Sequence, residues 1–370
     1  MDKIALYIHI PFCKSKCLYC DFLSYSGRED YIQDYINALI NEINSFKTPN
    51  TVTSVFIGGG TPSLIPHVYI ERIMDCIYSN FKVDKNAEIT IESNPGTVSL
   101  EKLSAYRKCG INRISLGVQA WQNKHLKTIG RIHTNEDIIN SLQLAKEVGF
   151  ENINCDLMFS LPNQSSEDFL ETIERVTALE PRHISAYSLI IEEGTPFYDM
   201  YDKGILPPIN EDEDRKMYHG AIKLLKEKGY YRYEISNFAK KGFECRHNLV
   251  YWHRGEYKGF GLGAASLINE ERLKNTEDFF EYIKGNNEVE RESLSLKDRQ
   301  EEFMFLGLRC DKGISKEDFF KIFGVDIESV YGKEIAKLSS QGLIFINKDR
   351  ICLTSKGFDL ANMVFVEFMQ

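Results

Sequence analysis

Near its N-terminus the chain reads Tyr7-Ile-His-Ile-Pro-Phe-Cys13-Lys-Ser-Lys-Cys17-Leu-Tyr-Cys20. The stretch is an apolar, strand-like run followed at once by three cysteines with the spacing C-x3-C-x2-C. Three thiolates on one short loop can hold three corners of a cubane iron–sulfur cluster, and the fourth iron then stays open for a small molecule. The spacing therefore predicts a [4Fe–4S] cluster with one open iron on Cys13, Cys17 and Cys20.

Other chemistries of cysteine fit this chain less well. A structural zinc site normally closes with four ligands, often from two C-x2-C knuckles, and no second knuckle follows. Disulfides are disfavoured by an odd total of nine cysteines and by an N-terminus without signal-peptide form. Burial in the core is the default for the cysteines inside apolar runs, which are Cys76, Cys109, Cys155, Cys310 and Cys352.

The composition is that of a soluble globular protein. The 370 residues suffice for two domains, and they are 43% hydrophobic and 27% charged. No apolar run approaches the roughly 20 residues that span a bilayer. We therefore expect a cytoplasmic protein. A net charge of −9 gives extended nucleic-acid binding no global electrostatic support, so no nucleic-acid partner is expected.

The first half of the chain alternates short strand-like runs with helical patterns. The candidate strands are Ile4–Ile10, Ser54–Gly58, Glu88–Glu92, Arg113–Val118, Asn152–Met158 and His183–Leu189. Helix signals stand between them: an amphipathic face in residues 31–46, N-cap side chains at Thr134 and Ser165, and C-cap glycines at Gly110 and Gly149. Six such units in series predict an α/β fold with a partial parallel (β/α)6 barrel in residues 1–210.

Chemistry in such folds collects at the C-terminal ends of the strands. The residues that we expect there are His9, Gly58–Thr61, Glu92, Gln119 and Asp156. Taken singly, each acid fits an ordinary surface ion pair better than a site. Their shared placement at strand ends is what favours a binding site.

The rest of the chain divides into a less regular connecting region, residues 211–290, and a C-terminal part, residues 291–370. In the latter, helical runs at residues 298–309, 316–323 and 327–341 precede a hairpin that turns at residues 347–349 and a final amphipathic segment, residues 355–369. This order looks like a winged-helix module. Its 12 Lys and Arg against 13 Asp and Glu make phosphate binding improbable, and we expect a packing or substrate-covering role.

The cysteine loop after a strand resembles that of the radical S-adenosylmethionine (SAM) superfamily. The resemblance implies a [4Fe–4S] cluster whose open iron chelates the amino and carboxylate groups of SAM. Reduction of the sulfonium then generates a 5′-deoxyadenosyl radical. Tyr19, directly before Cys20, matches the aromatic that in this superfamily usually lies near the adenine.

Gly58-Gly-Gly-Thr-Pro62 narrows the resemblance to the branch that contains the oxygen-independent coproporphyrinogen oxidases and their relatives. Its glycines let the backbone approach a ligand closely and resemble the superfamily motif that meets the SAM amino group. The residues expected to bind SAM on this resemblance are Tyr7, Tyr19, Gly59, Gly60, Thr61, Glu92, Gln119, Arg131 and Asp156. Arg131 would pair with the SAM carboxylate, and Asp156 would accept from ribose hydroxyls. His9 would support the site without ligating the cluster.

Two departures from the oxidase pattern and one motif separate the members of this branch. The oxidases carry a fourth cysteine where this chain has Phe22, and an N-terminal extension where it has six residues before Tyr7. His247-Asn-Leu-Val-Tyr-Trp252 instead looks like the HNxxYW motif of the heme-chaperone branch. An imidazole can ligate heme iron, which makes His247 the heme candidate, with Tyr251 and Trp252 against the porphyrin face. On sequence chemistry alone, the favoured interpretation is that His247 caps a loop and that the two aromatic side chains belong to the core.

The sequence thus favours a heme chaperone that carries a [4Fe–4S] cluster and SAM and passes heme to an acceptor protein, such as a membrane-associated respiratory protein. Whether it is also an enzyme is left open. The alternative is an oxygen-independent coproporphyrinogen III oxidase, which decarboxylates propionate side chains in heme biosynthesis. A radical SAM enzyme with an unrelated substrate is a third hypothesis.

Overall fold

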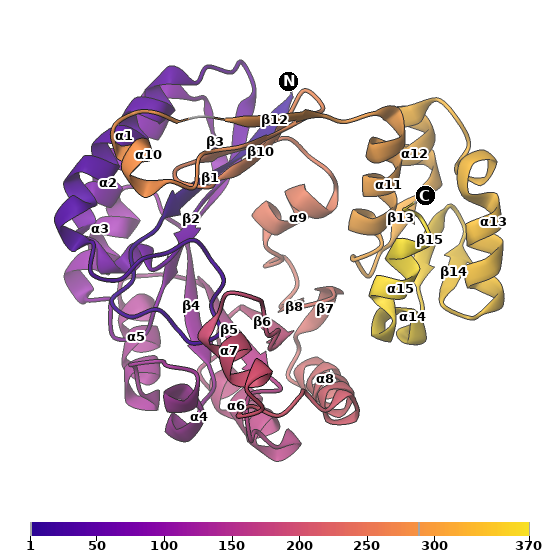
Figure 1. Ribbon diagram of the computed structural model, residues 1–370, viewed down its shortest axis with the longest axis horizontal. Coiled ribbons are helices and arrows are strands. Elements are labelled where there is room, and N and C mark those ends of the chain that lie inside the picture. The colour runs from indigo at the N-terminus through magenta and orange to yellow at the C-terminus, as the bar shows by residue number, and fades with distance from the viewer. Residues whose placement is uncertain (1, 288, 370) are drawn as a thin grey trace.

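The computed structural model describes residues 2–287 and 289–369, and a single large sheet dominates it (Figure 1). The sheet has 12 strands in the order β12-β11-β10-β9-β1-β2-β3-β4-β5-β6-β8-β7. Its central six strands are β1 (Lys3–Ile10), β2 (Thr51–Gly59), β3 (Val83–Ser93), β4 (Arg113–Gln119), β5 (Asn152–Phe159) and β6 (His183–Ser188). They are all parallel and follow chain order, which confirms the predicted partial barrel.

Helices cover the convex face of these six strands (Figure 1). They are α1 (Ile32–Ser45), α2 (His67–Asn80), α3 (Leu100–Lys108), α4 (Asn123–Thr128), α5 (Asn135–Glu147) and α6 (Ser166–Ala178). The apolar face of α1 is buried as predicted, at Ile32, Tyr35, Ile36, Leu39 and Ile43. Burial of this stripe against the strands supplies most of the helix's stability, because isolated helices of this length are marginal in water.

The predicted helix ends are confirmed in the structure. Thr134 and Ser165 each form a capping box with the acidic residue three positions later. Gly110 and Gly149 follow α3 and α5 with φ of 94° and 87°, a backbone conformation that residues with a Cβ adopt only at a cost. These local signals fix where each strand–helix unit turns, and therefore where the strand ends lie.

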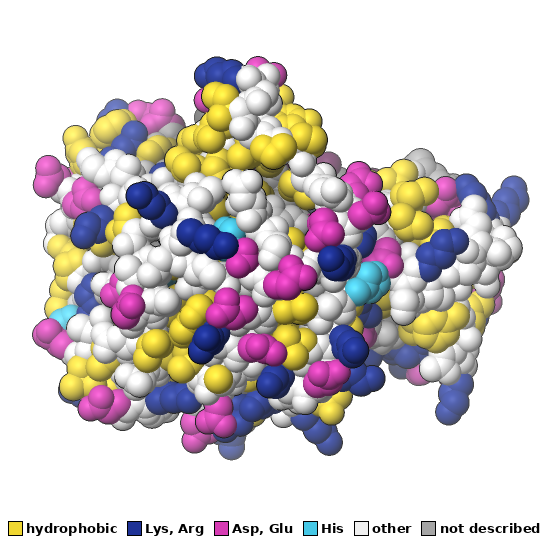
Figure 2. Space-filling model, turned by 90° about the horizontal axis from the view of Figure 1, so that it is seen from below, with side chains coloured by type: hydrophobic (Ala, Val, Ile, Leu, Met, Phe, Trp, Pro, Cys, Tyr) yellow, Lys and Arg dark blue, Asp and Glu magenta, His cyan; other side chains and the backbone are white. Residues whose placement is uncertain are grey.

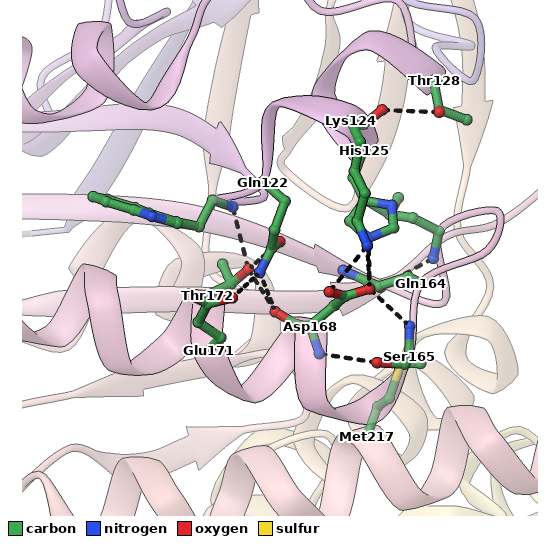
Figure 3. A network of polar contacts seen from close by, with 12 residues as sticks. Gln122, Lys124, His125, Thr128, Gln164, Ser165, Asp168, Glu171, Thr172 and Met217 are labelled. Carbon is green, nitrogen blue, oxygen red and sulfur yellow. Dashed lines mark hydrogen bonds and ion pairs between the residues drawn. The ribbon is translucent and has the colours of Figure 1, made fainter.

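A polar network ties α4 to the first turn of α6 (Figure 3). The Asp168 carboxylate accepts hydrogen bonds at 3.0 Å from both His125 Nε2 and Lys124 Nζ. Burial alone would raise the pKa of Asp168, but these hydrogen bonds outweigh it and lower the pKa to about 2. Gln122 completes the link by donating to the Asp168 carbonyl at 2.9 Å. The network holds the segment that follows β4 in place.

The connecting region was expected to be less regular, but it extends the sheet at both edges. It contributes β7 (Tyr231–Glu234), β8 (Asn237–Ala239), β9 (Tyr257–Phe260), β10 (Ala265–Ile268), β11 (Glu271–Lys274) and β12 (Glu290–Ser293), with α7 (Pro196–Asp202), α8 (Glu211–Glu227) and α10 (Phe279–Ile283) nearby. β9 pairs with β1 in parallel, and β8 pairs with β6 antiparallel. These strands are only three or four residues long, which is why their pattern was too weak to predict.

Helix α9 (Arg246–Trp252) lies in the opening between the two ends of the curved sheet (Figure 1). The C-terminal part stands beyond it and forms a separate lobe with both signs of charge on its surface (Figure 2). Arg254 binds Glu302 of this lobe at 2.8 Å, and Arg232 on β7 binds Asp311 at 2.7 Å. The lobe is therefore attached near both edges of the sheet.

The C-terminal lobe has its own core, distinct from the large core of the barrel. It contains α11 (Leu296–Gly307), β13 (Ile314–Ser315), α12 (Lys316–Phe323), α13 (Ile327–Ser340), β14 (Ile344–Asn347), β15 (Arg350–Leu353), α14 (Ser355–Asp359) and α15 (Ala361–Val366). The predicted hairpin is confirmed. The final segment buries one face, at Phe358, Val364 and Phe365, as an amphipathic segment does, and it is divided into two short helices at Leu360, where φ is −111° and ψ is 29°.

Within the described residues, every helix is either too short or too polar to cross a bilayer.

Candidate functional site

A cavity of about 330 Å³ opens at the C-terminal ends of the parallel strands. The size suits a small-molecule site. Nearly all predicted site residues line it: Cys13, Cys17, Tyr19, Cys20, Gly59, Gly60, Thr61, Glu92, Gln119, Arg131 and Asp156. Sequence positions more than a hundred residues apart thus meet at one wall, as the rule for parallel strand ends predicts. We call this cavity the cofactor pocket.

Backbone hydrogen bonds hold the cysteine loop in place at several points. Cys13 N–H donates to the Tyr25 carbonyl at 2.8 Å, and Tyr25 N–H donates to the Pro11 carbonyl at 2.7 Å. Further along the loop, Leu18 N–H donates to the Ile129 carbonyl at 3.1 Å. The thiols therefore project from a braced loop, with Cys13 buried and Cys17 and Cys20 half-buried.

The chemistry of these donors fits an iron–sulfur cubane. All nine cysteines are free thiols, and three of them line the same cavity. In the described part of the chain, no three Cys, His, Asp or Glu side chains converge closely enough to ligate one metal ion. A cubane does not require that convergence, because each thiolate binds a different iron. The arrangement thus suits a cluster better than a single zinc ion.

The glycine turn after β2 leaves room that any larger residue would fill. A Cβ on Gly60 would lie 3.0 Å from Cys13 Sγ and 2.8 Å from the Phe12 carbonyl oxygen. Gly59 has φ of 114°, and its N–H donates to Glu92 Oε2 at 3.0 Å. The glycines therefore bring bare backbone against both the cysteine loop and the acid at the end of β3.

Two carboxyl groups of unequal character face the pocket. Burial, and next the charge of Asp156, raise the pKa of Glu92 to about 8, although the Gly59 N–H opposes the shift. Asp156 accepts from Ser115 Oγ at 3.0 Å and from Asn154 Nδ2 at 2.7 Å. At neutral pH Glu92 is mostly protonated and can donate a hydrogen bond, whereas Asp156 offers acceptors.

Arg131 lies in the pocket wall and has one guanidinium nitrogen without a partner among the described residues. Its Nη1 donates to Asn94 Oδ1 at 2.7 Å and its Nη2 to the Tyr19 hydroxyl at 3.0 Å. Its Nε is buried and has no hydrogen-bond partner in the described structure. A buried, unpaired guanidinium donor at the edge of a cavity suits an anionic group of a ligand.

Tyr7 does not line the cofactor pocket, although the resemblance placed it among the SAM residues. Its hydroxyl bonds to His9 Nδ1 at 3.0 Å, and His9 Nε2 bonds to the Leu23 carbonyl at 2.8 Å. Because a carbonyl only accepts, Nε2 carries the proton and Tyr7 donates to Nδ1. His9 thus pins the far end of the cysteine loop to β1, which is the supporting position expected for it.

A second, inner cavity of about 290 Å³ lies below the cofactor pocket, between the concave face of the sheet and α9. Phe22, Glu92, Ser115 and Asp156 line both cavities. The lower part is lined by Tyr7, Phe56, Arg113, Asn154, Ser185, His247, Asn248 and Tyr251. The two cavities are therefore neighbours, and residues of the HNLVYW helix form one wall of the inner one.

His247, the predicted heme candidate, is buried in the wall of the inner cavity. It is 1% exposed, and its ring nitrogens bond to Ser54 Oγ at 2.9 Å and to the Tyr251 hydroxyl at 2.8 Å. Burial, and next the charge of Arg113, lower the pKa of His247 to about 3. Trp252 meets Arg309 instead, whose guanidinium carbon is 4.4 Å from the ring centroid. The structure therefore brings His247 and Tyr251 to the wall of the inner cavity and places Trp252 outside it.

Sequence reasoning missed several residues of the pocket wall. Asn94 joins Arg131 to Thr61, whose Oγ1 accepts from Asn94 Nδ2 at 3.0 Å. Tyr187 donates from its hydroxyl to Gln119 Oε1 at 2.9 Å. Both stand at or just beyond the end of a strand, so the strand-end rule that selected Glu92 and Gln119 could have selected them too.

Comparisons with known proteins agree with this geometry. Residues 7–176 match the family described as the radical SAM superfamily, and residues 294–360 match the HemN C-terminal domain. Heme chaperone HemW of Lactococcus lactis is 39% identical over 99% of this chain and 97% of that protein. Heme chaperone HemW of Bacillus subtilis is 38% identical over 99% of both, and that of Escherichia coli is 33% identical over 96% of both.

Among solved structures, the coproporphyrinogen III oxidase HemN from Escherichia coli, described as a radical SAM enzyme, superposes with a TM-score of 0.86. The match covers 99% of this chain and 90% of that one, at 25% sequence identity.

Proposed function

The chain belongs to the radical SAM superfamily and, within it, to the family of HemW heme chaperones, and from this premise we propose that it binds heme and passes it to an acceptor protein. The observation that carries the proposal is the full-length likeness to proteins named as heme chaperones. We expect the transfer to take place in the cytoplasm, to an acceptor such as a membrane-associated respiratory protein.

For the cluster, we assign Cys13, Cys17 and Cys20 as ligands, one to each of three irons. A cluster held this way supplies an open iron and an electron. The residues of this chain hold the loop that carries it: His9 through the Leu23 carbonyl, and Ile129 through Leu18 N–H. Gly60 leaves the space beside Cys13 in which no side chain would fit.

For SAM, we assign the remaining polar groups of the cofactor pocket. Arg131 Nε, which has no partner among the described residues, would meet the carboxylate. Asp156 would accept from the ribose hydroxyls, and protonated Glu92 would donate to an acceptor of the ligand. Tyr19, whose hydroxyl Arg131 already binds, presents its ring to the pocket as an aromatic surface. Tyr7 would not contact SAM directly; it would help to position the cysteine loop through its hydrogen bond to His9.

For heme, we assign an apolar surface at the mouth of the cofactor pocket. Phe22 provides it, at the position where the oxidases carry a fourth cysteine. Phe22 lines both cavities, and its side chain is 64% exposed. Exposed aromatic surface beside a cavity favours contact with a large apolar ligand. The oxidases of the branch carry cysteine at this position, so Phe22 favours the carrier over the oxidase. We further propose a packing or covering role for residues 291–370.

A transfer experiment tests the proposal directly. Protein loaded with hemin would be mixed with membranes from heme-depleted cells, and the appearance of holo-cytochrome would be followed by absorbance. We expect faster reconstitution than with the same concentration of free hemin, and no such gain when the carrier is hemin-loaded serum albumin. Equal rates for loaded protein and free hemin would contradict the proposal.

A second candidate is oxygen-independent coproporphyrinogen III oxidase, which the high structural similarity to HemN favours. Anaerobically reconstituted protein would be incubated with reductant, SAM and coproporphyrinogen III, and products would be separated after oxidation to porphyrins. We expect no protoporphyrin, because Phe22 replaces the cysteine of the oxidases. Catalytic amounts of protoporphyrin would replace the chaperone proposal with the oxidase.

A further inference from the structure

The inner cavity contains a buried positive charge whose hydrogen bonds the fold leaves incomplete. Arg113, on β4, lines this cavity and is 2% exposed. Its Nε is buried and has no hydrogen-bond partner among the described residues. Holding a guanidinium out of water without partners is costly, so such a group in a native structure requires an explanation. A ligand in the cavity would supply the missing acceptor.

Strand geometry separates Arg113 from the groups assigned to SAM. Alternate residues of a strand point to the same face, which on β4 groups Arg113 with Ser115 and Gly117. Arg113 lines the inner cavity, Ser115 lines both cavities, and Gly117 lines the cofactor pocket. The guanidinium therefore lies deeper along β4 than the SAM groups do, and SAM in the cofactor pocket would leave its Nε unpaired.

The acids around Arg113 are engaged by other groups. The charges of Glu88 and Asp156 act on the guanidinium, but neither carboxylate forms an ion pair with it in the described part of the chain. Glu88 Oε1 instead accepts the His247 N–H at 3.1 Å, and Asp156 accepts from Asn154 Nδ2 at 2.7 Å. The charge of Arg113 is thus stabilised from a distance, while its donors stay available.

A second unpaired polar group lies next to Arg113. Thr90 on β3 is the register partner of Arg113, and its hydroxyl is buried without a hydrogen-bond partner among the described residues. Residues paired in register on neighbouring strands present their side chains on the same face of the sheet. Two adjacent polar groups that lack partners indicate a missing ligand more strongly than one does.

Aromatic rings form another part of the cavity wall. The rings of Tyr7 and Phe56 are stacked with their centroids 6.3 Å apart, and the centroid of the Phe56 ring is 5.1 Å from that of His247. The volume of about 290 Å³ is near the lower limit for small-molecule sites. The cavity therefore suits a small group with an apolar stem and a polar head.

A carboxylate fits Arg113 better than other anions do. The planar fork of a guanidinium matches the two oxygens of a carboxylate in a bidentate pair. A phosphate matches the fork as well, but it would bring a second negative charge close to Asp156, which lines the same cavity. A single carboxylate balances the one positive charge of Arg113.

We propose that the inner cavity is a second ligand site of this protein, in which Arg113 binds a carboxylate. The carboxylate belongs either to a free small acid or to a propionate arm of heme held at Phe22, which lines both cavities. Because Glu92 and Asp156 also line both cavities, the bound group would lie beside SAM. A free acid satisfies Arg113 as well as heme does, so the site does not depend on the proposed heme binding.

A model acid tests the site without any substitution. Hydrocinnamate, which joins an aromatic ring and a short stem to a carboxylate, and its uncharged amide would each be titrated into the full-length protein by calorimetry. We expect the acid to bind about 10- to 100-fold more tightly than the amide, because the amide loses the hydrogen bonds between two charged groups.

Substitutions then assign the preference to Arg113. Arg113→Gln should abolish it, whereas Arg309→Gln should keep it. Arg309 is a matched control, because its Nε is also buried without a described partner but it lies against Trp252, outside the inner cavity. A preference for the acid that survives in folded Arg113→Gln would overturn the proposal.

Two further variants cover the case in which Arg113→Gln does not fold. Arg113→Lys keeps the charge but loses the fork, and it should bind hydrocinnamate at least about 5-fold more weakly than wild type does. Ser185→Leu narrows the inner cavity without changing Arg113, and it should weaken the acid similarly. Wild-type affinity in both variants, with wild-type circular dichroism spectra, would contradict the site.

Hemin and hemin dimethyl ester distinguish the two sources of the carboxylate. If a heme arm occupies the cavity, wild type binds hemin at least about 10-fold more tightly than the ester, and hydrocinnamate competes with hemin. If a free acid occupies it, both hemes bind equally and hydrocinnamate binds alongside them.

Failure of the site and failure of the heme function give different results. Saturable binding of hemin, with no preference for the acid in either pair of ligands, would overturn the carboxylate site and leave the proposed function standing. Binding of hydrocinnamate that depends on Arg113, without any saturable binding of hemin, would do the reverse.

Discussion

The cofactor pocket and helix α9 carry equally recognisable sequence motifs, but their key side chains differ in whether the protein itself satisfies their hydrogen bonds. In the pocket, Cys13, Cys17, Cys20 and Arg131 open into a cavity, and Arg131 keeps a buried donor without a described partner. In α9, His247 has both ring nitrogens engaged and is 1% exposed. A motif in the sequence thus identifies which residues matter. Only the hydrogen-bond partners of those residues in the structure show whether they are free to bind a ligand or instead stabilise the fold.

The largest expected effect is the loss of the iron–sulfur cluster when one of the three pocket cysteines is replaced. If the cluster were retained, the pocket would no longer differ from α9 as a ligand-binding site. Cys17→Ala should lower the content after anaerobic reconstitution from about four iron and four sulfide per chain to nearly none, because two thiolates on this loop cannot retain a cubane. The control Cys76→Ala, on the outer helix α2, should keep the full content. Iron and acid-labile sulfide analysis measures both, and retention of the cluster in Cys17→Ala would contradict the ligand assignment.

The second prediction concerns the contribution of His247 in α9 to the stability of the fold. His247→Ala should lower the free energy of unfolding by about 2–4 kcal/mol, because it leaves Ser54 and Tyr251 unpaired and opens a cavity. Asn248→Ala, on the same helix and half-buried, should cost less than about 1 kcal/mol. Urea unfolding of the protein without added heme measures both. Equal stabilities of His247→Ala and wild type would mean that the hydrogen bonds of His247 to Ser54 and Tyr251 do not stabilise the protein.

A third prediction concerns the unpaired donor in the pocket. Arg131→Gln should weaken SAM binding to the reconstituted protein by about 10- to 100-fold, since charged hydrogen bonds contribute about 1.5–3 kcal/mol. Arg175→Gln, on the exposed face of α6, should leave the affinity unchanged. Isothermal titration with SAM gives both values. An unaltered affinity for Arg131→Gln would place the SAM carboxylate elsewhere.

The smallest expected effect is on how steeply the free energy of unfolding changes with pH. The pKa of His247 is about 3 in the folded protein and near 6.5 when unfolded, so unfolding takes up a proton between these values. Stability is therefore lost as pH falls below about 6.5, by about 1.4 kcal/mol per pH unit from this residue. His247→Gln should show a slope shallower by that amount in urea unfolding from pH 6 to pH 4. An identical slope would mean that His247 is protonated in the native state.

Much of the barrel could be predicted, because its signals are local. Apolar runs marked the six parallel strands, Thr134 and Ser165 marked helix starts, and Gly110 and Gly149 marked helix ends. Strand order followed from the chain order of the β–α units. The site residues at the strand ends then followed without any knowledge of side-chain contacts.

The failures lie where long-range packing decides the outcome. The short strand β9 forms because it pairs with the edge of β1. Nothing in the local sequence of β9 indicates that this edge is available. The C-terminal segment splits at Leu360, where its two short helices pack separately into the core of the lobe. Tyr7 misses the cofactor pocket because the alternation along β1 points it at His9 and α9.

The sequence by itself determined the cysteine loop, the glycine turn and the parallel architecture, since these depend on spacing, on the lack of a Cβ and on periodic burial. The tertiary structure alone decided the fate of each histidine. A sequence cannot tell whether an imidazole will find partners on other elements of the fold, and here Ser54 on β2 and Tyr251 on α9 bind both ring nitrogens of His247. The physical reason is that ligand-binding capacity is what remains after the fold has satisfied its own buried polar groups.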